Sequence, residues 1–94
     1  MPALREIMDA APPKEFEDAV RQIAATVPGV INVEKCRLRK MGVEFYVDIH
    51  IGVDAAITVR DGHRIAHKVK DAIRAANAAA ADVLVHIEPI ESEG

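Results

Sequence analysis

Four side chains that could bind a metal ion occur as two pairs, each with a single residue between its members. Asp48 and His50 form the first pair, and His86 and Glu88 form the second. Residues two apart in a β-strand lie on the same face of a sheet, and neighbouring strands run about 5 Å apart. If the two strands are neighbours, two imidazoles and two carboxylates therefore converge on one patch. Imidazole and carboxylate together suit borderline divalent cations such as Zn²⁺, so the pairs predict a metal site.

Two more histidines, His63 and His67, are four residues apart, the spacing that places side chains together on one helical face. Such a pair can chelate a metal ion, although an exposed pair can equally be part of a solvated helix surface. The chain has one cysteine, Cys36, so a thiolate metal site and an internal disulfide are both excluded within one chain. Cys36 is expected to be a small core residue.

The strand that must carry the first pair is the best-defined element of the sequence. Apolar residues alternate strictly with polar or small residues over Val43–Asp54. This period of two predicts a β-strand with one face in the core and the ligand pair on the other, uncovered face. A preceding strand is expected at Val30–Met41, joined by a turn in which Gly42 supplies a positive φ. Because the apolar residues of that strand do not share one face, a bulge is expected near Glu34 and Lys35.

Two helices are expected, one before and one after this pair of strands. The first begins at Pro12-Pro13 and is stopped by Pro28-Gly29. The second is capped by Thr58 and fades in Asn77–Ala81. Each helix has an apolar stripe at helical spacing. The first stripe contains Phe16, Val20, Ile23, Ala24 and Val27, and the second contains Val59, Ile65, Ala66, Val69, Ala72, Ile73 and Ala76.

A third strand, Asp82–Glu88, carries the second ligand pair, and Pro89 is expected to end it. The order helix, strand, strand, helix, strand predicts an α+β fold, a two-layer αββαβ sandwich of the ferredoxin-like type. The helix between the second and third strands implies a right-handed crossover, which puts both helices on one face of a three-stranded sheet. The other face is left bare, and self-association through it is the first expectation.

Composition narrows the range of functions. The 94 residues make one domain, with a net charge of −3 and only three aromatic residues. A sheet that stacks nucleic-acid bases needs a row of exposed aromatics, and only Tyr46 is available, so a nucleic-acid partner is not expected. The sequence shows neither a nucleophile–base pair nor a phosphate-cradling glycine loop, so an enzyme is not expected either. It also contains no apolar run long enough to span a bilayer.

Nearly the whole chain resembles a known family. The run PGVINVEKCRLRKMGVEFYVDIHIGVD, then TVRDGHRIAHKVKDAI, and finally ADVLVHIEP are similar to the cytoplasmic C-terminal domain of cation diffusion facilitator (cation efflux) transporters. No single motif is diagnostic, but their order is fairly specific. The resemblance implies a linker arm over residues 1–11 leading from an absent transmembrane domain, a metal-binding dimerisation domain over 12–90, and a tail over 91–94.

The resemblance also implies a fold, a ligand set and a cofactor. Members have a metallochaperone-like fold and form homodimers that bind a divalent metal, with zinc favoured and iron or manganese as alternatives. By position, the implied ligands are His50, His63, His86 and Glu88. Asp48 matches a ligand of the magnetosome-type members, which handle iron, and His67 has no firm counterpart. Lys35 stands where many members have an aspartate that contacts the membrane domain.

The function implied by the resemblance is that of a cytosolic regulatory domain. Metal bound at the dimer draws the two subunits together and promotes transport by the transmembrane domain. The alternative is a metal-independent dimerisation scaffold whose metal site has degenerated. The two alternatives differ in how the melting temperature responds to added metal. A ligand that binds the native state raises the melting temperature, so the regulatory domain should respond and the scaffold should not.

Overall fold

The computed structural model describes residues 13–76 and 80–91, so the expected linker arm and the end of the tail lie outside it. The element order is α2 (Pro13–Ala25), β1 (Asn32–Met41), β2 (Glu44–Asp54), α3 (Val59–Ala76) and β3 (Ala80–Ile90). The predicted αββαβ order is therefore confirmed. Within the described part of the chain, no helix has both the length and the hydropathy needed to cross a membrane.

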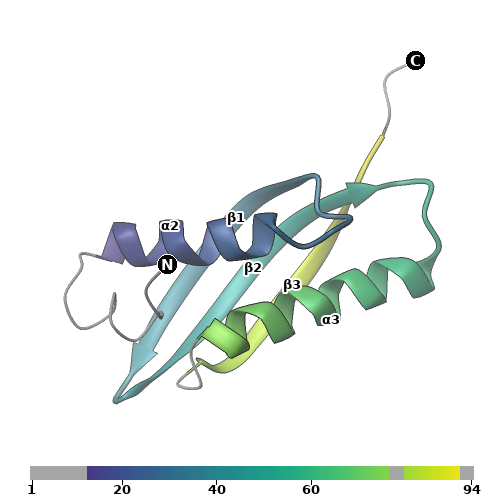
Figure 1. Cartoon of the computed structure of the whole chain (residues 1–94). Coiled ribbons are helices and arrows are strands. Elements are labelled where there is room, and N and C mark those ends of the chain that lie inside the picture. The colour runs from purple at the N-terminus through teal and green to yellow at the C-terminus, as the bar shows by residue number, and fades with distance from the viewer. Residues whose placement is uncertain (1–12, 77–79, 92–94) are drawn as a thin grey trace.

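The sheet has three strands in the order β1-β2-β3, with β1 antiparallel and β3 parallel to the central strand β2. Helices α2 and α3 lie side by side over one face of this sheet, and the opposite face has no covering element among the described residues (Figure 1). The parallel pairing follows from the intervening helix, since a parallel connection needs a long crossover. The two-layer architecture predicted from the sequence is confirmed.

The core lies between the helices and the covered face of the sheet. The alternation predicted for β2 is observed, because Phe45, Val47, Ile49, Ile51 and Val53 are all buried. They meet the apolar stripes of the two helices, which contribute Phe16, Ala19, Val20, Ala24, Val69 and Ile73 to the same cluster. Because alternate residues of a strand point to opposite faces, burial of the odd positions directs the even ones, including Asp48 and His50, to the open face.

Two local predictions that position the site are also confirmed. The register between β1 and β2 shifts between Val33 and Lys35, which is the expected bulge. The β1–β2 hairpin turns through Gly42 at a φ of 65°, a conformation that L-residues seldom adopt. Between the bulge and the hairpin turn, Arg37 lies opposite Asp48 and Arg39 lies opposite Tyr46.

Two details of the sequence prediction were wrong. Pro89 does not end the third strand, because β3 continues to Ile90. As an edge strand, β3 can contain a proline without breaking the ladder, since its outer side needs no partner. Val59 is not part of the buried stripe and is 91% exposed. It is the first residue of α3, and burial begins one turn later, at Gly62.

Candidate metal centre

The parallel register of β2 and β3 brings the two strand histidines together. His50 lies directly opposite His86. Two residues further along each strand, Gly52 lies opposite Glu88. The two imidazole rings stack nearly parallel, with centroids 4.1 Å apart and an interplanar angle of 11°. Both side chains are partly buried, so the rings are held by the sheet and partly shielded from water.

The carboxylate of Asp48 lies beside both imidazoles. Asp48 Oδ1 is 2.9 Å from His86 Nε2 and 3.7 Å from His50 Nε2. One ligand atom from each of these three residues lies within 4.8 Å of the other two. Two imidazole nitrogens and one carboxylate oxygen make a three-ligand face for a borderline divalent cation.

Glu88 contacts the same cluster from the other side, through the second nitrogen of His50. Glu88 Oε1 is 3.1 Å from His50 Nδ1. An ionised carboxylate can only accept a hydrogen bond, so in that state Nδ1 carries the proton and donates it. This tautomer leaves the lone pair on Nε2 of His50, the nitrogen closest to Asp48. A carboxylate that fixes the tautomer of a ligand histidine in this way is a recurrent feature of metal sites.

Two atoms at the centre of the cluster have no hydrogen-bond partner within the described part of the chain. Asp48 Oδ1 and His86 Nε2 are both buried, and their 2.9 Å approach does not have hydrogen-bond geometry. Leaving a buried polar atom unsatisfied costs about 1–3 kcal/mol, and such atoms are uncommon in native proteins. A cation bound between the oxygen and the nitrogen would satisfy both. The chemistry of the donor set therefore fits a divalent metal ion.

The six residues singled out in the sequence fall into two groups. Asp48, His50, His86 and Glu88 come together on the open face through the contacts given above. His63 and His67 lie on α3 and are both exposed, and their Nε2 atoms are 3.0 Å apart. That all six residues bind metal stays a prediction.

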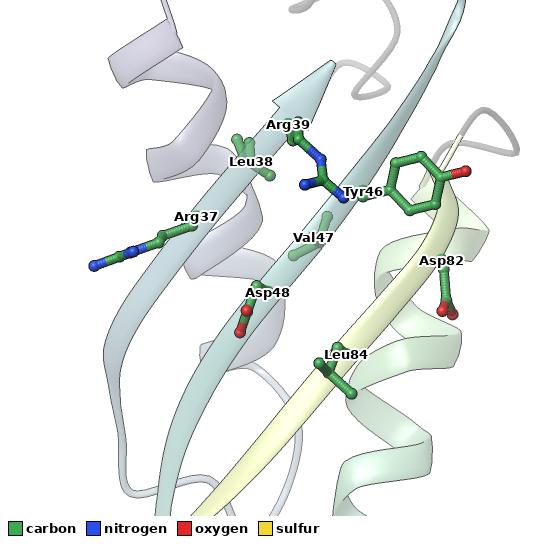
Figure 2. A pocket seen from close by; sticks show the side chains of 8 residues that line it. All are labelled: Arg37, Leu38, Arg39, Tyr46, Val47, Asp48, Asp82 and Leu84. Carbon is green, nitrogen blue, oxygen red and sulfur yellow. The ribbon is translucent and has the colours of Figure 1, made fainter. Parts of the chain in front are cut away.

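A pocket of about 530 Å³ lies next to the cluster on the open face and shares Asp48 with it (Figure 2). The residues that line it come from all three strands and are Arg37, Leu38, Arg39, Tyr46, Val47, Asp48, Asp82 and Leu84. Arg39 reaches toward Tyr46, and its guanidinium carbon is 5.7 Å from the ring centroid. The sequence patterns described above do not predict this pocket. The signal that could have found it is the β1–β2 register, which pairs each arginine with a pocket residue of β2.

Cys36 is separated from the cluster by the sheet. It lies opposite Ile49 and is buried in the core, as expected. Burial, followed by the negative charge of Glu17, raises the pKa of the thiol from 9.0 to about 11. The thiol therefore stays protonated at neutral pH, and a metal at the open face has only nitrogen and oxygen ligands from the described residues.

A family model of the cytoplasmic domain of cation efflux proteins matches residues 12–90. The chain belongs to this family. Among curated relatives, this cation efflux domain is 31% identical to metal tolerance protein C1 of Arabidopsis thaliana over 87 residues, which are 93% of this chain and 18% of the relative. It is 26% identical to the cation-efflux pump FieF of Pectobacterium atrosepticum over 90 residues, or 96% of this chain and 30% of the pump. The domain thus spans less than a third of the length of these relatives.

Solved structures with the same fold are C-terminal domains of MamM. One of them superposes with a TM-score of 0.78 at 28% identity, covering 82% of this chain and 98% of that domain. A nickel form of a single-residue variant gives a TM-score of 0.79 at 28% identity, covering 83% and 99%. Manganese and cadmium forms of other variants are similar to this cation efflux domain as well. The metallochaperone-like α+β fold expected from the sequence is confirmed.

Proposed function

We propose that this domain is the metal-sensing regulatory part of a divalent-metal efflux transporter. Metal binding on the open sheet face would draw two copies together and promote transport by the transmembrane domain. The observation that carries the proposal is a pair of buried atoms, Asp48 Oδ1 and His86 Nε2, beside the Nε2 atom of His50; neither has a hydrogen-bond partner among residues 13–76 and 80–91. The family membership and the much greater length of the relatives support the link to a transporter.

The ligand chemistry favours zinc, with iron or manganese as alternatives. Two imidazoles suit Zn²⁺, while the carboxylates also suit harder cations such as Mn²⁺. The MamM domains named as manganese, cadmium and nickel forms support a site that accepts several divalent ions. In this assignment Asp48, His50 and His86 bind the ion, and Glu88 orients His50.

The open face also supports association of two copies. Leu84 is 56% exposed and Tyr46 is 37% exposed on a sheet face that the described helices leave uncovered. In a homodimer built through this face, the carboxylates Asp48 and Glu88 of one copy approach those of the other and repel them. A divalent cation removes this repulsion, and it shifts the population toward the closed dimer only as far as it binds that state more tightly.

The proposal is tested by titrating the protein with Zn²⁺ in a calorimeter, comparing Asp48→Asn with Glu44→Gln. Both substitutions remove one carboxylate charge from β2, and Glu44 is an exposed residue four positions away on the same strand. We expect Asp48→Asn to weaken Zn²⁺ binding by at least about tenfold, the effect of losing even an outer-shell partner of a metal site. Glu44→Gln should bind as the wild type does.

The dimer part of the proposal needs a separate measurement. Sedimentation with and without Zn²⁺ should show a more compact or more fully dimeric protein in the presence of the ion. The metal-independent scaffold would be supported instead if the wild-type protein is a dimer and Zn²⁺ changes neither its melting temperature nor its sedimentation.

A further inference from the structure

We propose that the pocket on the open sheet face binds a small organic carboxylate. The charged end of this ligand pairs with the guanidinium of Arg39, and its apolar body lies against Tyr46 and Leu84. The inference goes beyond the proposed function, because no metal ion takes part in holding the carboxylate. Of the residues that line the pocket, only Asp48 is also part of the metal cluster.

The pocket is built on two rows of neighbours that run across the three strands. They are Arg39, Tyr46 and Asp82 in one row and Arg37, Asp48 and Leu84 in the next. Its volume of about 530 Å³ is in the range of sites for small organic molecules. Because the sheet register fixes the backbone of both rows before any ligand arrives, binding costs the protein little conformational freedom.

The charge that remains available in the pocket is positive. Asp82 is paired with Lys70 of α3, with 3.1 Å between Oδ1 and Nζ. Asp48 belongs to the metal cluster and lies against its imidazoles. Arg37 and Arg39, in contrast, form no ion pair with any of residues 13–76 and 80–91. A pocket whose carboxylates are engaged and whose guanidiniums are not attracts an anion.

Arg39 is the cation best placed to bind that anion. Its guanidinium carbon is 5.7 Å from the ring centroid of Tyr46, and Figure 2 shows it directed toward this ring, whereas Arg37 points away from β2. The attraction between cation and ring holds the guanidinium in place, and a guanidinium can offer two parallel N–H donors to one carboxylate.

The apolar surface beside Arg39 indicates that the anion is organic. Leu84 is 56% exposed and Tyr46 is 37% exposed, and both line the pocket. An inorganic anion would leave this surface in water, whereas a carboxylate with a hydrocarbon body covers it and gains the free energy of its burial. The ligand class is therefore a carboxylate with an apolar body of a few carbon atoms.

The test uses the fluorescence of Tyr46, which is the only tyrosine in a chain without tryptophan. The whole domain, dialysed free of metal and chelator, is titrated with cyclohexanecarboxylate. We expect a saturable change in tyrosine fluorescence that requires higher ligand concentrations as ionic strength rises. The neutral isostere cyclohexanecarboxamide should cause no such change, and inorganic phosphate should bind at least about tenfold more weakly because it buries no apolar surface.

Two charge-matched variants locate the binding group. Arg39→Gln should weaken binding of cyclohexanecarboxylate by at least about tenfold, the loss expected for hydrogen bonds to a charged group. Lys40→Gln removes the same charge from the next exposed position of β1, but Lys40 lies opposite the buried Phe45 and so alternates away from the pocket. This control should bind as the wild type does.

A third variant separates this proposal from the metal proposal. Asp48→Asn removes a negative charge from the pocket wall, so it should strengthen binding of cyclohexanecarboxylate while it weakens binding of Zn²⁺. The two proposals can therefore fail separately, because the carboxylate titration contains no metal.

Three results would overturn the carboxylate site. Unchanged binding by Arg39→Gln would remove its anchor, and equal affinity for phosphate would remove the organic ligand class. The third result is that cyclohexanecarboxylate leaves the fluorescence of Tyr46 unchanged while Arg39→Gln shifts the protein between monomer and dimer in sedimentation. The pocket would then be filled by a second copy of the chain.

Discussion

The two histidine pairs of this domain have similar composition and are built in opposite ways. His50 and His86 come from different strands and stack face to face at 11°, whereas His63 and His67 share one helix and meet edge to face at 76°. The strand pair is partly buried and has carboxylates on both sides, while the helix pair is exposed. The first pair therefore exists only when the whole sheet has formed, and the second needs only a few turns of helix.

The largest effect on stability is expected from a substitution in the core beneath the strand pair. Ile49 lies between Asp48 and His50 on β2, points to the core and is fully buried. Ile49→Ala should reduce the free energy of unfolding by about 2–5 kcal/mol, through lost burial and the cavity left behind. Urea denaturation measures this change. In parallel calorimetric titrations, Zn²⁺ binding at the strand pair should weaken as well.

The matched control is Leu84→Ala, which also removes an aliphatic side chain from a strand. Leu84 is 56% exposed on the open face. Its replacement by alanine should therefore reduce the free energy of unfolding by much less than Ile49→Ala does. Equal destabilisation by the two substitutions would mean that the open face is covered in solution, most simply by a second copy.

An intermediate effect is expected from two glycines, one next to each pair. At Gly52, opposite Glu88 in the sheet, an added Cβ would overlap Asn32 Oδ1 and Ile90 Cδ1. Gly52→Ala should therefore cost about 1 kcal/mol, the low end for overpacking because side-chain ends can move aside. At Gly62, next to His63, an added Cβ would lie 3.8 Å from Ile87 Cγ2, an ordinary contact. Gly62→Ala should instead stabilise α3 by about 0.5–1 kcal/mol.

Thermal unfolding followed by circular dichroism measures both changes, and each variant is the control for the other. Gly52→Ala should also weaken metal binding at the strand pair, because the side chain that must move aside, Ile90, is two residues from Glu88 on β3. The comparison between the pairs breaks down if the signs of the two stability changes are the same.

The smallest effect on metal binding is expected at Cys36. Cys36→Ala should leave metal binding at the strand pair unchanged, because the thiol is buried on the core side of β1 and its pKa is raised to about 11. The same pKa predicts a pH effect on stability. Between pH 9.0 and 11 the folded thiol keeps a proton that the unfolded thiol loses, so stability falls as pH rises through this window. The alanine variant should lack this part of the pH dependence in chemical denaturation.

Most of the fold was predictable because periodicity reports burial directly. The strict alternation of β2 indicated which residues face the core, and that alternation alone put Asp48 and His50 on the open face. The bulge of β1 was predictable for the same reason, since its apolar residues could not share one face. The end of β3 was mispredicted at Pro89, because the cost of a proline depends on whether the strand is at an edge, which is a property of the sheet.

The spacing of residues within each strand predicted part of the candidate site, but it could not predict how the strands pair. Placing His86 and Glu88 two residues apart made a shared face evident, but nothing local determined that His50 would lie opposite His86. The role of Glu88 also depended on contact geometry, because its carboxylate meets the far nitrogen of His50. The pocket beside Asp48 escaped prediction since it requires the register of all three strands together.

The parallel arrangement of β2 and β3 has one further consequence. Asp48 on β2 and His86 on β3 face each other across the two strands, and the whole of α3 lies between them in the chain. An ion held between the two strands therefore binds only a chain whose sheet and intervening helix are in place, and its binding free energy adds to the stability of the whole domain. Metal bound between the strands would thus protect the domain against proteolysis and mechanical opening.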